Sequence, residues 1–140
     1  MAIVKSYTDL EQSKKLAGIL PIASNDFAWC IFSNGSTRLL PMDDWVVSEY
    51  AKSNVEIIPC FSLAALLGVL PNKIVSHETA FEGEDAEGIN DIYYKCIEST
   101  EDDRYMCRYV GNGYKYECVA DNPIDTCYKM ILKLNELNLL

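Results

Sequence analysis

Apolar and polar positions follow two different spacings along this 140-residue chain. Apolar residues three or four positions apart are typical of helices, whereas short runs rich in aromatic and β-branched residues between turn residues are typical of strands. Helices are predicted over residues 8–20, 43–52 and 62–70 and from residue 123 onward. Strands are predicted over 27–32, 37–40, 57–59, 73–79, 90–97, 105–110 and 114–119.

Residues that begin and end helices support these ranges. Thr8 and Glu11 have the spacing of a capping box, and Pro21 is expected to end the first helix near Leu20. Asn122 can cap the last helix, because it directly precedes Pro123, a residue favoured in the first turn. The last helix is expected to lie across a sheet.

The first of two predicted hairpins turns at Asn34-Gly35. If these are the two central residues of the turn, Cys30 pairs with Leu39 and Trp29 pairs with Leu40. Both faces of this hairpin carry apolar residues, so we expect packing on each.

The second predicted hairpin turns at Asn112-Gly113. A two-residue turn pairs Arg108 with Glu117, Tyr109 with Tyr116 and Cys107 with Cys118. This register predicts a core face that carries Tyr105, Cys107, Tyr109, Tyr116 and Cys118. The other, wetter face is predicted to carry Met106, Arg108, Val110, Lys115 and Glu117. Cys96 is expected on the same core face, one strand further along.

Together the elements predict an α+β fold: an antiparallel sheet with N-terminal, central and C-terminal helices packed mainly on one face. The length fits a single globular domain over residues 1–140, and 49% apolar and 24% charged residues are ordinary for such a domain. The longest apolar run, residues 63–70, is too short to span a membrane. With no secretion signal apparent, a cytoplasmic protein with reduced cysteines is expected.

The formal net charge of −9 is concentrated in one segment. Residues 78–103 contain ten acidic residues and one base, Lys95, while the rest of the chain is neutral. Such a segment repels nucleic acid and anionic membranes and attracts a basic protein. The candidate partner-binding residues are Glu82, Glu84, Asp85, Glu87, Asp91, Glu101, Asp102 and Asp103.

Candidate chemistry is sparse. His77 is the only histidine, and the six cysteines have no Cys-x-x-Cys spacing, so no metal site or cofactor is predicted. The spacing of residues 82–91 does not fit a calcium-binding EF-hand loop. Several tyrosines fall on the predicted strands, but a base-stacking platform needs a basic groove, which the acidic loops do not supply.

Three stretches, residues 7–17, 58–67 and 121–127, together resemble a group of small uncharacterised proteins encoded by gut Bacteroidales and their phages or mobile elements. The resemblance covers both ends and the middle of the chain. It implies an accessory or phage-associated role and supplies no activity and no catalytic residues.

Three functions remain open from the sequence. The first is a small acidic, non-enzymatic interaction protein that meets a basic partner. The second is a small enzyme or ligand-binding protein with a pocket between sheet and helices, using Cys107, Cys118, Tyr109 or His77. The third is a homo-oligomeric structural component, which an exposed apolar patch at Trp29, Trp45 or Leu139 would indicate.

Overall fold

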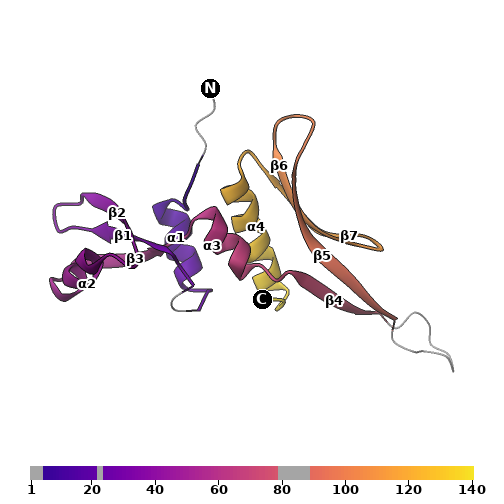
Figure 1. The fold of residues 1–140 in the computed structure, drawn as a ribbon, viewed down its shortest axis with the longest axis horizontal. Helices are drawn as coiled ribbons and strands as arrows, with labels where there is room; N and C mark the ends of the chain where they lie inside the picture. The colour runs from indigo at the N-terminus through magenta and orange to yellow at the C-terminus, as the bar shows by residue number, and fades with distance from the viewer. Residues whose placement is uncertain (1–4, 22–23, 79–88) are drawn as a thin grey trace. The chain divides into compact units, whose positions relative to one another are not determined.

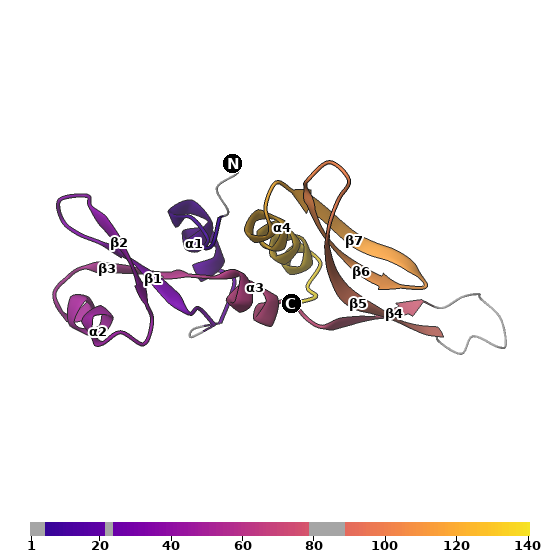
Figure 2. The same ribbon diagram turned by 45° about the horizontal axis from the view of Figure 1, so that its top comes forward.

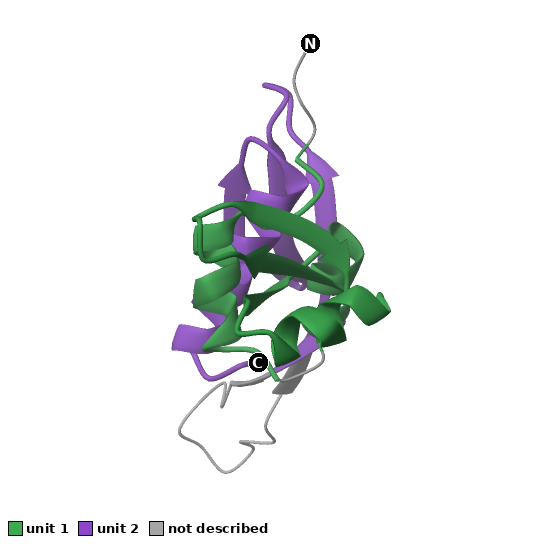
Figure 3. Ribbon diagram, turned by 90° about the vertical axis from the view of Figure 1, so that its left-hand side faces the viewer, with its two compact units in different colours: residues 1–69 green, residues 70–140 purple. Residues whose placement is uncertain are grey.

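A computed structural model describes residues 5–21, 24–78 and 89–140 of the chain, with the backbone alone for residues 76–78 and 89–91. Among these residues there are four helices and seven strands, and all strand pairs are antiparallel (Figure 1). The predicted α+β class is therefore confirmed. The strands form two sheets, and the chain divides into two compact units, residues 1–69 and residues 70–140 (Figure 3).

The first unit is built on a three-stranded sheet of order β2-β1-β3. Its core cluster contains Ala28, Cys30 and Leu40 from the sheet and Val47 from a helix. Trp29 alternates with these residues and donates from its indole nitrogen to the Thr8 carbonyl, so the opposite face is also occupied. The elements are α1 (Leu10–Ala17), β1 (Phe27–Ile31), β2 (Thr37–Pro41), α2 (Trp45–Lys52), β3 (Glu56–Cys60) and α3 (Leu63–Val69).

The register of the first hairpin differs from the prediction by one residue. Trp29 pairs with Leu39, and Cys30 pairs with Arg38 rather than with Leu39. The loop has three residues instead of two, because the Phe32 amide bonds to the Ser36 carbonyl and Gly35 takes a positive φ of 82°. A type I turn followed by a left-handed glycine gives this three-residue loop.

The start of α1 is also shifted by one residue. Asp9, rather than Thr8, is the N-cap: its carboxylate accepts from the Gln12 amide at 2.8 Å, and the Gln12 side chain accepts from the Asp9 amide at 3.1 Å. The predicted capping box exists, then, one position further along the chain. The helix ends at Ala17, before Gly18.

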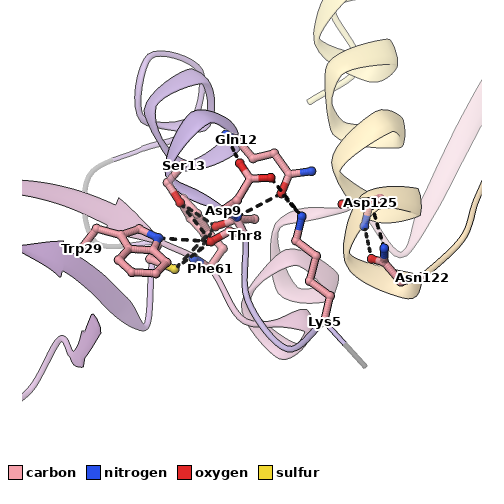
Figure 4. Close-up of polar contacts among 10 residues, drawn as sticks. Lys5, Thr8, Asp9, Gln12, Ser13, Trp29, Phe61, Asn122 and Asp125 are labelled. Carbon is pink, nitrogen blue, oxygen red and sulfur yellow. Dashed lines mark hydrogen bonds and ion pairs between the residues drawn. The ribbon is translucent and has the colours of Figure 1, made fainter. Parts of the chain in front are cut away.

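Thr8 has a structural role that the prediction missed. Its hydroxyl is fully buried, accepts from the Phe61 amide at 3.1 Å and lies 2.8 Å from the Ser13 hydroxyl (Figure 4). Its amide donates to the Phe61 carbonyl at 2.9 Å. These bonds join the start of α1 to the residue that follows β3, and they satisfy polar groups that would be costly to bury unpaired.

The second unit is a four-stranded sheet of order β4-β5-β6-β7 with one long helix against it (Figures 1 and 2). The elements are β4 (Lys73–Glu78), β5 (Ile89–Ser99), β6 (Tyr105–Gly111), β7 (Gly113–Ala120) and α4 (Pro123–Glu136). The helix begins as predicted, since the Asn122 side chain accepts from the Asp125 amide at 2.9 Å. Its buried residues contact β6 and β7, which confirms that it lies across the sheet.

The second hairpin keeps the predicted pair Cys107–Cys118, but Tyr109 pairs with Lys115 rather than with Tyr116. The predicted two-residue turn at Asn112-Gly113 is wrong, since Val110 pairs with Tyr114 and Gly111 with Gly113. Tyr116 and Glu117 together face Arg108, and Tyr116 has a positive φ of 54°, which is a β-bulge. The predicted neighbours still meet. The Tyr109 and Tyr116 ring centres are 6.5 Å apart, and Arg108 lies 3.9 Å from a Glu117 oxygen.

Candidate functional site

The two faces of the four-stranded sheet differ in what covers them. On the inner face, Cys107 and Tyr109 are fully buried, as are Cys127, Met130 and Ile131 of α4. The Tyr109 hydroxyl donates to the Pro71 carbonyl at 2.7 Å. These side chains form the hydrophobic core of this unit.

The residues predicted to line a pocket in an enzyme or ligand-binding protein lie on three strands of this sheet, β4, β6 and β7. Cys107 and Tyr109 lie in the core, and Cys118 is half-buried opposite Cys107. His77 pairs with Asn90 through the backbone of β4, and its side chain is not among those described. A hydrogen bond with Cys127 and burial raise the pKa of the Cys107 thiol, so it is protonated at neutral pH.

The predicted position of Cys96 is wrong. It pairs with Arg108 and therefore shares the outer face, whereas Ile97 pairs with Cys107 on the core face. The thiol that meets Cys107 belongs to Cys127 of α4. All six cysteines are free thiols, and the described residues contain no cluster of His, Cys, Asp or Glu suited to a metal ion.

The outer face is open and largely apolar. Val75 pairs with Ile92, Tyr94 pairs with Val110, and Val110 pairs with Tyr114, so the five side chains lie on one side of the sheet. Tyr94 and Tyr114 are 57% and 62% exposed, and Val75 and Ile92 are 39% and 40% exposed. We call Val75, Ile92, Tyr94, Val110 and Tyr114 the outer apolar patch.

Arg108 lies next to this patch, and its positive charge is balanced by neighbouring carboxylates. One guanidinium nitrogen is 2.6 Å from a Glu98 carboxylate oxygen, and the guanidinium carbon is 3.8 Å from the centre of the Tyr114 ring. The cation holds the Tyr114 ring from one side, since a guanidinium is attracted to the face of an aromatic ring. Glu98 and Glu117 together outnumber Arg108 at this end of the face, whereas Lys73, which pairs with Tyr94, places a positive charge at the other end of the patch.

An acidic turn joins β5 to β6. Thr100 organises it: its amide donates to the Arg104 carbonyl at 2.7 Å, and its hydroxyl accepts from the Arg104 amide at 3.1 Å. The Thr100 hydroxyl also donates to the Asp102 carboxylate, and this bond lowers the pKa of Asp102. Glu101, Asp102 and Asp103 are all exposed.

The two predicted acidic segments begin at opposite ends of β5. One precedes Ile89 and the other follows Ser99, and an 11-residue strand is about 36 Å long. Glu82, Glu84, Asp85 and Glu87 lie outside the described residues, and of Asp91 only the backbone is described. Of the candidate partner-binding side chains, the structure therefore describes those of Glu101, Asp102 and Asp103.

The residues proposed for self-assembly differ in exposure. Trp45 is 74% exposed at the start of α2, whereas Trp29 is partly buried and hydrogen-bonded to Thr8. Leu139, after α4, is partly buried.

Sequence reasoning missed the outer apolar patch because it did not assign the faces of β4 and β5. The strict alternation of Ile92 and Tyr94 with Tyr93 carried that information, since Tyr93 is buried and its two neighbours are exposed.

No family model, no curated protein and no solved structure matches this chain. In the described ranges, no helix is long and apolar enough to cross a membrane.

Proposed function

We propose that this protein is a small non-enzymatic interaction protein that binds a basic protein partner through the outer face of its four-stranded sheet. The observation that carries the proposal is the outer apolar patch, in which two tyrosines more than half exposed lie beside exposed Val75 and Ile92. A contiguous exposed apolar surface of this kind is typical of an interaction site.

The composition of the patch supports a protein partner. Tyrosine and arginine are enriched among the residues that contribute most to protein–protein binding, because they combine a large apolar area with a polar end. Tyr114 is held in place by Arg108, so little conformational freedom of its ring is lost on binding.

The charge on the side of the patch toward the β5–β6 turn supports a basic partner. Glu98 and Glu117 flank Arg108, and the acidic turn begins at Thr100, six residues or about 20 Å along β5 from Tyr94. A partner with an apolar centre and lysine or arginine side chains around it would match this surface. The resemblance to phage and mobile-element proteins makes a basic protein of the host, such as a nucleic-acid-binding protein, a suitable partner.

A selection from a random peptide display library would test the proposal. We expect peptides enriched against the native protein to be basic and to contain apolar residues. The double variant Tyr94→Ser/Tyr114→Ser should bind these peptides at least tenfold more weakly, because it removes most of the apolar contact. Trp45→Ser is the matched control, since it removes an exposed aromatic side chain outside the patch.

The contribution of charge is tested separately. Glu101→Gln, Asp102→Asn and Asp103→Asn together should weaken binding severalfold at 50 mM salt and have a smaller effect at 300 mM, because salt screens exposed charges. Peptides that carry no net positive charge, or that bind the double variant as well as the native protein, would refute the proposal.

A further inference from the structure

The first unit contains a second candidate site, a hollow of about 470 Å³. This volume lies within the range of small-molecule sites, about 300–1,000 Å³. The hollow is formed by the end of α1, by residues between α1 and β1, by β3 with the residue that follows it, and by the segment between β2 and α2. Its lining residues are Ala17, Leu20, Pro21, Asn25, Met42, Asp43, Ile57, Pro59 and Phe61.

Most of the lining is apolar. Phe61 is almost completely buried, whereas Met42 is 42% exposed, so Phe61 lies deep and Met42 lies near the opening. Ile57 and Pro59 are partly buried. A ligand must therefore present an apolar body to these side chains.

The polar lining offers hydrogen-bond acceptors. Asp43 is the one charged residue among those that line the hollow, and it is exposed. Asp44, the next residue, caps the start of α2. Among the described residues, the Asp43 side chain forms no hydrogen bond or ion pair. Asn25 donates its side-chain amide to the Phe27 carbonyl at 2.8 Å, which leaves its amide oxygen as an acceptor.

We propose that this hollow binds a small organic cation, an ammonium group attached to an aromatic or aliphatic body. The apolar body contacts Phe61 and Ile57, and the ammonium group donates to the Asp43 carboxylate and the Asn25 oxygen. An apolar lining with one carboxylate matches such a ligand in both shape and charge. This site is independent of the outer apolar patch, because it lies in the other unit.

Titration of the whole protein with 2-phenylethylammonium, followed by amide chemical shifts in NMR spectra, tests the proposal. The neutral analogue 2-phenylethanol has nearly the same shape and is the comparison ligand. We expect the ammonium compound to shift the amides of Ile57 and Phe61 and to bind at least threefold more tightly than the alcohol. Asp43→Asn should remove that difference, because an exposed ion pair contributes a factor of this size.

A space-filling variant locates the binding. Ala17→Phe should weaken both ligands at least fivefold, whereas Ala51→Phe, at an exposed position of α2 outside the hollow, should leave both affinities unchanged. Equal affinities of the native protein for the two ligands would overturn the proposal. So would unchanged binding to Ala17→Phe, or shifts confined to other parts of the chain.

Discussion

The guanidinium of Arg108 lies over the Tyr114 ring, with its central carbon 3.8 Å from the ring centre. The same guanidinium pairs with Glu98 on β5 and approaches Glu117 on β7, so one side chain connects three neighbouring strands. Because Arg108 is 18% exposed, its charge is partly removed from water and its contacts are screened less than those of a free surface arginine.

The variant Arg108→Lys is expected to lower the free energy of unfolding by about 0.5–1 kcal/mol. Lysine keeps the charge but loses the planar group that stacks on Tyr114. Urea unfolding followed by circular dichroism measures the change. Arg104→Lys is the control, because its ion pair with Asp121 is exposed and should contribute little. Equal stability of Arg108→Lys and the native protein would contradict a structural role for the stacking.

Removal of one buried hydroxyl tests the core beneath α4. Tyr109→Phe leaves the Pro71 carbonyl without its 2.7 Å hydrogen bond, and we expect a loss of about 1–1.5 kcal/mol in urea unfolding. Tyr114→Phe removes a hydroxyl from a ring that is 62% exposed and should change stability by less than about 0.5 kcal/mol. If both variants lost the same stability, the Tyr109 bond would not be the cause.

The polar contacts of Thr8 predict a larger effect in the first unit. Thr8→Val keeps the shape of the side chain but leaves the Phe61 amide without its acceptor, at a cost of about 1–3 kcal/mol. Thermal unfolding should therefore occur at a lower temperature. Thr37→Val, at an exposed strand position, is the matched control and should be neutral or slightly stabilising. A melting temperature unchanged in Thr8→Val would show that this amide finds another acceptor.

The buried thiols predict a loss of stability at alkaline pH. The hydrogen bond with Cys127 and burial raise the pKa of Cys107 above its ordinary value of 9.0, and burial raises the pKa of Cys60 and Cys118. A group whose pKa is higher in the folded state stabilises that state below the unfolded pKa, and the contribution is lost as pH rises above about 9. The slope for one such thiol is up to about 1.4 kcal/mol per pH unit.

Urea midpoints measured in the presence of a reductant should therefore fall between pH 9 and 11. Cys60→Ala is less stable at pH 7 but should lose less between pH 9 and 11 than the native protein, because one of the contributing thiols is absent. Parallel declines in the two proteins would show that Cys60 does not contribute to the alkaline instability.

The strand positions and the helix starts could be predicted because they depend on local chemistry. The Asn122 cap with Pro123 follows from steric and hydrogen-bonding preferences of neighbouring residues and is confirmed. The Cys107–Cys118 pair is present as well, but the turn is shifted by one residue and the bulge at Tyr116 restores the register. Local prediction was wrong by one residue where two adjacent choices were nearly equal. Thr8 and Asp9 both have a side chain that can cap, and the turn at Asn34-Gly35 can close with two or three residues.

Tertiary packing decided these cases. The Thr8 hydroxyl is engaged by the Phe61 amide and the Ser13 hydroxyl, and Asp9 caps the helix. Cys96 was placed on the wrong face because its register depends on the β5–β6 pairing, and no turn sequence of the kind found in the other hairpins fixed that pairing.

The sequence by itself determined the α+β class, the order of the elements and the acidic excess between residues 78 and 103. These properties depend on residue spacing and on charge, both of which are local. Only the tertiary structure decided that the strands form two sheets, that Val75, Ile92, Tyr94 and Tyr114 lie on one exposed face, and that Asp43 lies at an apolar hollow. Each of these depends on which distant segments pair and pack, and that is set by burial over the whole chain rather than by any single stretch of it.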